Sequence, residues 1–401
     1  MPSFHSFQLR ASSREALSRM KIDTPTAIQE RSIPLLLAGR DVIGQAQTGS
    51  GKTLAFGLPL MERCDEKERQ VQALVLTPTR ELARQVSHVL TALAKEARIK
   101  VALIYGGRAF GPQETALADG AQVVVGTPGR VLDHLRRRTL RLGQLRMLVL
   151  DEADEMLDQG FAPDVERILA MTPRSRQTAL FSATIPPWVD KIAAKHLSDP
   201  EVLVAEEGDG SDPEIDHFVV EAYGEDKFQV LLRLLDEPTE GGTLVFGRTK
   251  RGVSNLGRRL QAQGHQVAVL QGNLDQKARD RALERFRSGL VPILVATNVA
   301  ARGLDILHIG RVINYELPET HELFTHRVGR TGRMGRSGRA ITLVGATDLA
   351  KWQAIERGLG RRLPRVSASG KPAPVRPETA GAMKGPRSWG RRRWSRRRTR
   401  V

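Results

Sequence analysis

The sequence predicts an α/β fold made of two parallel sheets, each covered by helices on both faces. Short apolar runs alternate with segments of helical spacing along most of the chain, which is typical of buried parallel strands joined by helices. An acidic stretch with Gly and Pro at 205–216 divides these runs into two groups. The length of 401 residues suits two or three domains at ~100–200 residues each.

The strands are predicted from apolar runs that end in small or polar residues. In the first half we expect them at 71–77, 101–105, 122–127, 146–151 and 177–182, and in the second half at 243–247, 266–271, 291–297, 311–316 and 340–344. Segments 81–95 and 164–170 have helical spacing. We therefore expect one domain over 1–204, a linker over 205–216, a second domain over 217–363 and a disordered tail over 364–401.

Composition excludes several classes of protein. Hydrophobic residues make up 40%, enough to bury cores, but no run approaches the ~18 apolar residues of a membrane span. The N-terminus has no apolar segment of the kind found in secretory signals. The single cysteine, Cys64, forms no internal disulfide or zinc site, and we interpret it as an ordinary thiol in a reducing cytoplasm.

The positive charge is concentrated at the C-terminus. The net charge is +17, yet residues 357–401 hold 15 basic residues and one acid, so the first 356 residues carry only +3. Such a run often binds polyanions, most commonly nucleic acid. Trp389 and Trp394 stand among these arginines, where stacking on bases and simple exposure are both open interpretations.

A phosphate site is predicted at Ala46-Gln-Thr-Gly-Ser-Gly-Lys-Thr53, which follows an apolar segment and precedes a helical pattern. Glycines let backbone N–H groups turn toward phosphate oxygens, and the helix N-terminus adds positive potential. Lys52 would reach the β- and γ-phosphates and Thr53 would bind Mg²⁺. Ala46 replaces the first glycine of the general pattern, so a chance Gly-rich turn is the alternative.

Acids follow the apolar strand at 146–151. Asp151-Glu152-Ala153-Asp154 would lie at the carboxyl end of a parallel strand, the edge where ligands bind in such sheets. Acids there suit a metal ion and an ordered water, whereas acids in a solvated loop would have no such role. The phosphate loop about 100 residues upstream favours the metal site.

These residues resemble a known family. Asp151-Glu152-Ala153-Asp154 is the signature of the DEAD-box RNA helicases of superfamily 2, and the chain is similar to bacterial members such as the heat-resistant RNA-dependent ATPase group. The resemblance covers nearly all of 4–345, with the motifs in the family's order. It implies two tandem RecA-like domains, ATP and Mg²⁺ as cofactors, and RNA-stimulated ATP hydrolysis coupled to local, non-processive unwinding of short RNA duplexes and RNP remodelling.

The resemblance also implies roles in the nucleotide site. Gln29, in a motif over 24–29 with Phe4 upstream, would recognise adenine, and Asp305 the ribose. Glu152 would activate the attacking water, Asp151 would hold Mg²⁺, and Arg330 and Arg333 would act as arginine fingers. The implied catalytic residues are Lys52, Asp151, Glu152, Arg330 and Arg333; the nucleotide-binding residues are Gln29, Thr48, Gly49, Ser50, Gly51, Lys52, Thr53 and Asp305; the metal ligands are Thr53 and Asp151.

Further motifs imply coupling and RNA contacts. The coupling residues are Asp154, Ser182, Thr184 and His326; the RNA contacts are Pro78, Thr79, Arg80, Gly107, Thr127, Gly129, Arg130, Arg248, Thr249, Gln276, Arg279 and Thr297. Their chemistry suits phosphate binding without sequence readout. The chain departs from the family at Lys21-Ile22, where Gly-aromatic is usual, at 271–273, and at Asn298, where Asp is commoner.

Two rival classes remain at this point. A DNA helicase of the same superfamily is disfavoured by Asp154 and the adenine motif, and a non-catalytic RNA scaffold is favoured only by Ile22. We expect a cytoplasmic monomer without membrane association. Its partners would be RNA of any sequence, single-stranded or in short duplexes, and ribosomal or RNA-decay complexes.

Overall fold

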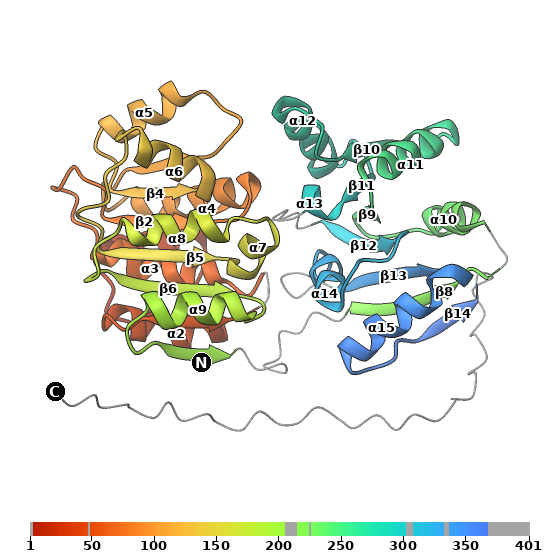
Figure 1. The fold of residues 1–401 in the computed structure, drawn as a ribbon, viewed down its shortest axis with the longest axis horizontal. Coiled ribbons are helices and arrows are strands. Elements are labelled where there is room, and N and C mark those ends of the chain that lie inside the picture. The colour runs from red at the N-terminus through yellow and green to blue at the C-terminus, as the bar shows by residue number, and fades with distance from the viewer. Residues whose placement is uncertain are drawn as a thin grey trace.

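Two parallel seven-stranded sheets, each sandwiched between helices, form the computed structural model and confirm the predicted fold class (Figure 1). The structure describes residues 3–46, 49–204, 215–223, 226–301, 308–332 and 337–367. Tail residues 368–401, with Trp389 and Trp394, lie outside this description.

The first sheet has the strand order β3-β4-β2-β5-β6-β1-β7. Its strands are β1 (Val42–Gln45), β2 (Ala73–Leu76), β3 (Val101–Ile104), β4 (Val123–Gly126), β5 (Met147–Asp151), β6 (Gln177–Ser182) and β7 (Glu201–Val204). Its helices are α1 (Ala11–Met20), α2 (Ala27–Leu37), α3 (Lys52–Arg63), α4 (Arg80–Ala94), α5 (Phe110–Ala118), α6 (Pro128–Arg136), α7 (Ala153–Asp158), α8 (Ala162–Ala170) and α9 (Pro187–His196), preceded by a 3₁₀ turn at Phe4–Ser6. Helices α1–α4 bury their apolar side chains against one face of the sheet and α6–α9 against the other.

The second sheet repeats this arrangement in the order β10-β11-β9-β12-β13-β8-β14. Its strands are β8 (Ile215–Glu221), β9 (Gly242–Gly247), β10 (Val267–Leu270), β11 (Ile293–Thr297), β12 (Ile309–Asn314), β13 (Gly338–Val344) and β14 (Arg365–Ser367). Its helices are α10 (Lys227–Asp236), α11 (Lys250–Ala262), α12 (Gln276–Arg287), α13 (Asn298–Ala301), α14 (His321–Val328) and α15 (Leu349–Leu359), with a 3₁₀ turn at Ala346–Asp348. Helices α10 and α11 cover one face, and α12, α14 and α15 the other.

The strand cores explain why the sequence folds this way. Strands such as β2 and β5 are apolar and buried throughout, as expected for central parallel strands covered on both faces. Each is followed by a polar turn and a helix, and this alternation produces the parallel order. Polar side chains that follow the strands are thereby collected at the carboxyl edge of each sheet.

Two predicted boundaries are wrong by a few residues. Strand β8 begins at Ile215, inside the predicted linker, and β14 lies at 365–367, inside the predicted tail. Both pair in parallel with the second sheet, through Val219 with Arg365 and Glu221 with Ser367. β14 has a single apolar residue, too few to predict a strand locally, whereas β8 has four in seven but adjoins the acidic stretch that hides its start. β8 pairs with β13 as well as with β14, and this pairing holds both in the sheet.

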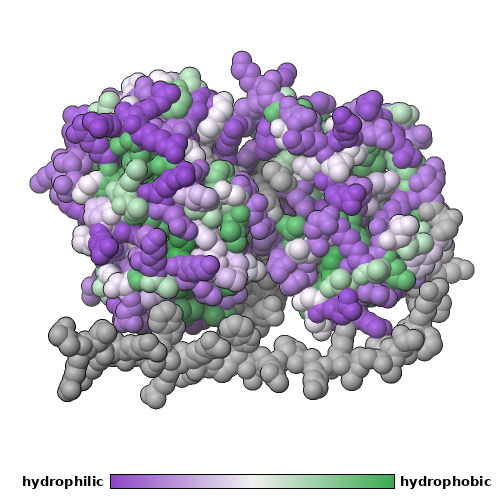
Figure 2. Space-filling view, in the orientation of Figure 1, coloured by the Kyte–Doolittle hydropathy of each residue, from purple (hydrophilic) through white to green (hydrophobic). Residues whose placement is uncertain are grey.

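Hydrophilic residues cover most of the face shown in Figure 2, with apolar residues in scattered patches. Within the described ranges, no helix combines the length and apolarity needed to cross a bilayer. Cys64 is buried, and burial raises the pKa of its thiol to about 12.

Candidate nucleotide and RNA site

The phosphate loop lies between β1 and α3, as the sequence predicts. Gly49 and Gly51 both have φ near +91°, a region that favours glycine. Gly51 is the residue just before α3, and a Cβ there would lie 2.5 Å from Gln29 Nε2. Lys52 is buried and donates from Nζ to the carbonyl of Ala46 at 2.9 Å. Thr48 lies outside the described residues.

Gln29 links the predicted adenine motif to the phosphate loop. Its Oε1 accepts from Thr26 N–H at 3.0 Å and its Nε2 donates to the Gly51 carbonyl at 2.9 Å, while the Thr26 hydroxyl donates to the Ser50 carbonyl at 2.8 Å. An amide has a second lone pair and a second hydrogen. One Oε1 lone pair and one Nε2 hydrogen of Gln29 therefore remain for a further partner.

Asp151 and Glu152 lie buried where β5 meets α7. Glu152 has φ of 54°, in the left-handed region, a strained conformation for a residue with a Cβ. Burial raises the pKa of Asp151 to about 7; Lys52 opposes this shift, and Glu152 and Asp154 add to it. Its Oδ1 is buried without a hydrogen-bond partner among the described residues.

The unpartnered carboxylate oxygen fits a bound cation. Among the described residues no cluster of three or more His, Cys, Asp or Glu side chains could hold a metal ion alone. Mg²⁺ typically binds one or two carboxylates plus substrate phosphates and waters. Asp151, with Thr53 in the first turn of α3, fits this mode.

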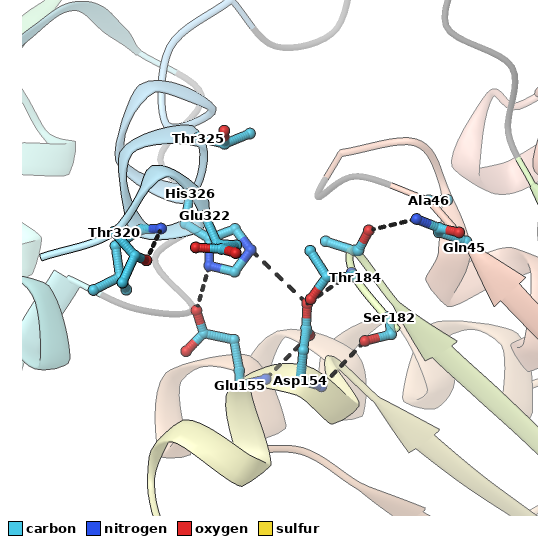
Figure 3. Close-up of polar contacts among 12 residues, drawn as sticks. Gln45, Ala46, Asp154, Glu155, Ser182, Thr184, Thr320, Glu322, Thr325 and His326 are labelled. Atoms are coloured by element: carbon cyan, nitrogen blue, oxygen red, sulfur yellow. Dashed lines mark hydrogen bonds and ion pairs between the residues drawn. The ribbon is translucent and has the colours of Figure 1, made fainter. Parts of the chain in front are cut away.

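Asp154 joins the strand-end acids to the end of β6 (Figure 3). Its Oδ2 accepts from both the N–H and the hydroxyl of Thr184 at 2.9 Å, and its own N–H donates to Ser182 Oγ at 3.1 Å. The Ser182 carbonyl in turn accepts from Ala46 N–H at 3.0 Å, at the start of the phosphate loop. The structure thus brings the three predicted first-domain coupling residues into one hydrogen-bonded unit.

His326 extends this unit to the second domain (Figure 3). Its Nδ1 lies 2.8 Å from Glu155 Oε1 and its Nε2 lies 3.9 Å from Asp154 Oδ2. Burial lowers the His326 pKa, but the hydrogen bond and charge of Glu155 and the charge of Asp154 outweigh it, so the net pKa is raised. Sequence analysis missed Glu155, which the structure shows to be buried. Its position directly after the four-residue signature is the signal that could have drawn attention to it.

Arg330 follows α14 and is 5% exposed, with its Nε donating to the His326 carbonyl at 3.2 Å. It is thus adjacent to the junction of the two domains. Arg333 and Asp305, the other residues expected to reach nucleotide from this domain, lie outside the described residues.

Many predicted RNA contacts lie at helix N-termini. Helices α4, α6, α11 and α12 begin at Arg80, Pro128, Lys250 and Gln276, and of these Arg80 and Gln276 are predicted RNA contacts. Free N–H groups and the helix dipole favour phosphate at such places. The residues expected to bind RNA just before these helices are Pro78, Thr79, Thr127 and Thr249, and Gly129 is in the first turn of α6. The hydroxyls of Thr79 and Thr249 cap their helices.

Two predicted RNA arginines pack against their own domain. A Cβ on Gly107 would lie 2.3 Å from Arg80 Nη1, so glycine is needed for this approach. The Arg130 guanidinium lies 4.0 Å from the centroid of the Phe110 ring and donates to the Arg108 carbonyl at 2.9 Å. The Arg130 side chain is only 9% exposed, so its contacts are those of a residue that positions the 106–110 loop.

Arg80 also contacts the second domain, and the remaining RNA candidates lie at this junction or at the ends of strands in the second sheet. Arg80 Nη1 donates to Gln276 Oε1 at 2.8 Å, and Arg279 Nη2 lies 2.5 Å from Glu81 Oε1. These pairs join α4 to α12, and sequence reasoning missed Glu81. Arg248 and Thr249 are exposed after β9, while Thr297 is 6% exposed at the end of β11.

The fold and site define a P-loop NTPase of two RecA-like domains whose junction contains the acids that follow β5. Family models match as a DEAD/DEAH box helicase over 26–192 and a helicase conserved C-terminal domain over 226–335. The chain is 44% identical to the ATP-dependent RNA helicase CshA of Listeria monocytogenes, covering 92% of this chain and 71% of that one. It is also 44% identical to the DEAD-box ATP-dependent RNA helicase CshA of Geobacillus kaustophilus, covering 91% and 78%. The chain belongs to the DEAD-box family of ATP-dependent RNA helicases.

Solved structures agree with this assignment. S. cerevisiae Dbp5 bound to RNA and ADP BeF3 matches with a TM-score of 0.84 and 36% identity, over 92% of this chain and 96% of that one. A Dbp5 variant bound to a Gle1 variant and IP6 matches at 0.75 and 35% identity, over 92% and 95%. The two domains are therefore arranged more like the RNA- and nucleotide-bound form of Dbp5.

Proposed function

We propose that this protein is an ATP-dependent RNA helicase that couples RNA-stimulated ATP hydrolysis to local, non-processive unwinding of short RNA duplexes and RNP remodelling. The observation that carries this proposal is the hydrogen-bonded unit of Asp154, Ser182 and Thr184, which His326 contacts from the other domain. A change at the phosphate loop can reach the domain junction through this unit. The family relationship supports the same activity.

In the nucleotide site, residues Gly49 to Gly51 would bind phosphates through backbone N–H groups, with Lys52 on the β- and γ-phosphates. Mg²⁺, held by Asp151 and Thr53, would neutralise charge on the phosphates when bound. Lys52 would then exchange its bond to the Ala46 carbonyl for phosphate oxygens. Gln29 would recognise adenine while holding Gly51.

Hydrolysis would need groups from both domains. Glu152 would orient the attacking water and accept its proton. Arg330 and Arg333 would stabilise charge on the γ-phosphate, an effect of roughly 10³–10⁵ in rate for arginine fingers. Because the acids and the arginines belong to different domains, hydrolysis should require their closure, and RNA bound to both domains favours it.

RNA would bind along helix N-termini of both domains through its backbone, without sequence readout. The basic tail would add a sequence-independent tether. Because β14 is part of the second sheet, the truncation that tests the tether should end at Ser367. Loss of the tail should weaken RNA affinity and flatten its salt dependence, while ATP turnover at saturating RNA is retained.

The experiment that tests this function is ATP hydrolysis with and without single-stranded RNA, with Glu152→Gln as the control variant. We expect strong RNA stimulation that Glu152→Gln abolishes, and faster unwinding of a short duplex with an RNA than with a DNA loading strand. Equal RNA binding with and without nucleotide, with no turnover, would instead indicate a scaffold. We further propose a cytoplasmic monomer working with ribosomal or RNA-decay complexes.

A further inference from the structure

A second junction between the domains lies away from the phosphate loop, around Asp280 of α12. Asp280 Oδ1 lies 3.0 Å from Arg84 Nη1 of α4, and Asp280 Oδ2 lies 3.6 Å from Arg108 Nη2. Gln276 Nε2 donates to the same Oδ1 at 3.0 Å. One carboxylate of the second domain is thus shared by two guanidinium groups of the first.

Arg108 is held in place by a stack of side chains in the first domain. The Phe110 ring contacts two guanidinium groups, with Arg130 at 4.0 Å and Arg137 at 3.8 Å from its centroid. Its centroid is also 5.1 Å from that of the buried His134 ring. Because Arg130 donates to the Arg108 carbonyl, the stack fixes the backbone from which Arg108 extends.

The charges at this junction are reversed relative to those of a neighbouring ion pair between the domains. Arg279, the residue before Asp280, pairs with Glu81 of the first domain, so there the second domain provides the base. At Asp280 it provides the acid. Two adjacent ion pairs of opposite polarity define one register between α4 and α12, because a shift along the helices would bring like charges together.

We propose that Asp280, Arg84 and Arg108 form an electrostatic clasp that stabilises the closed arrangement of the domains. Asp280 is a positioning residue: it acts by holding the second domain where Arg330 can reach the nucleotide. Its consequence for turnover rests on the proposed function, but its effect on closure does not. The side chain of Asp280 is 29% exposed, which leaves the clasp sensitive to salt.

Closure can be measured directly by fluorescence transfer between labels on the full chain. Cys64 is buried at 1% exposure, so labels attach selectively to cysteines introduced at exposed positions by Thr115→Cys on α5 and Gln263→Cys beyond α11. Without ATP or RNA, we expect Asp280→Asn to lower the closed-to-open ratio roughly two- to five-fold per ion pair lost. High salt should reduce the difference between the two proteins.

The matched control is Glu237→Gln. Glu237 forms an ion pair of 2.9 Å with Arg339 inside the second domain, with both side chains partly exposed. This variant changes the net charge by the same amount and should leave closure unchanged. In a double-mutant cycle, Arg84→Gln should have little further effect once Asp280→Asn is present.

The clasp would be overturned if Asp280→Asn left the closed-to-open ratio unchanged, or if it gave the same ratio as the control Glu237→Gln. Additive effects of Arg84→Gln and Asp280→Asn would overturn it as well. So would an Arg84→Gln variant that weakens RNA binding and leaves closure without RNA intact, since Arg84 would then serve phosphate. A lack of ATP turnover in the wild type would contradict the proposed function while leaving this measurement valid.

Discussion

The two halves of this molecule have equivalent sheets but carry charges of opposite sign near their junction, acids in the first and arginines in the second. Each has seven parallel strands in an equivalent order, with β1 and β8 in matching places. In the first domain, β1 leads to the phosphate loop and β5 to the buried acids. In the second, the residues near the junction include the buried arginines Arg327 and Arg330.

A pair of lysines makes the difference concrete. Lys52 and Lys227 are both the first residue of the helix that follows the matching strand. Lys52 donates to a backbone carbonyl at 2.9 Å, a bond that phosphate can replace. Lys227 forms an ion pair with Asp348 and donates to the Leu343 carbonyl at 3.0 Å, so its charge is already neutralised. The same scaffold therefore supports a ligand site in one half and a structural bond in the other, and the loops decide which.

Replacing each lysine by alanine should give the largest difference between the two domains. We expect Lys52→Ala to reduce ATP turnover on the order of 10²–10³-fold with little change in the free energy of unfolding. Lys227→Ala should leave turnover of the folded protein nearly intact but destabilise the second domain by about 1–3 kcal/mol, because Asp348 loses its partner. Turnover and urea unfolding of both variants test this, and equal loss of turnover would refute the contrast.

The junction itself should depend on pH. The pKa of His326 is raised above 6.5 because Glu155 and Asp154 outweigh burial, with Arg330 opposing them. The interaction is therefore fully present below pH 6.5 and is lost as pH rises through the raised pKa. We expect domain closure to weaken several-fold between about pH 6 and 9. His326→Gln should remove this dependence, and a pH profile identical in the variant would contradict the assignment.

An effect on stability is expected at Asn298 in the second domain. Arg327 is 3% exposed, burial lowers its pKa to about 9, and its Nε donates to Asn298 Oδ1 at 2.5 Å. Asn298→Asp would place a carboxylate there and should stabilise the domain by about 1–2 kcal/mol. Urea unfolding measures this. The control Asn255→Asp, on the exposed face of α11, should change stability by less than about 0.5 kcal/mol.

The smallest effect concerns the first domain. Lys21 directly follows α1 and has a φ of 57°, where glycine is preferred. Lys21→Gly should stabilise this domain by about 0.5–1 kcal/mol. Lys95→Gly, at a residue with φ of −56° at the end of α4, should instead destabilise it. Thermal unfolding of the two variants measures this. If both melting temperatures shift in the same direction, the left-handed conformation carries no cost.

Sequence predicted the central strands, because apolar runs are local signals. The family resemblance implied coupling roles for Asp154, Ser182 and Thr184, but the hydrogen bonds that join them come from the structure. It failed at β8 and β14, which depend on pairing between segments about 145 residues apart in the chain. It also missed Glu81, Glu155 and Asp280, whose partners lie in the other half of the chain. A charged residue in a helical pattern is indistinguishable from a solvated one until the opposite domain is in place.

In the proposed function, catalysis is divided between the domains, with acids on the first and arginines on the second. Single-turnover ATP hydrolysis by Arg330→Ala, with and without RNA, tests it most directly, alongside measured ATP and RNA affinities. We predict that the variant binds both ligands but that RNA no longer accelerates hydrolysis. RNA-accelerated hydrolysis at the wild-type rate would contradict this division of catalytic groups between the domains.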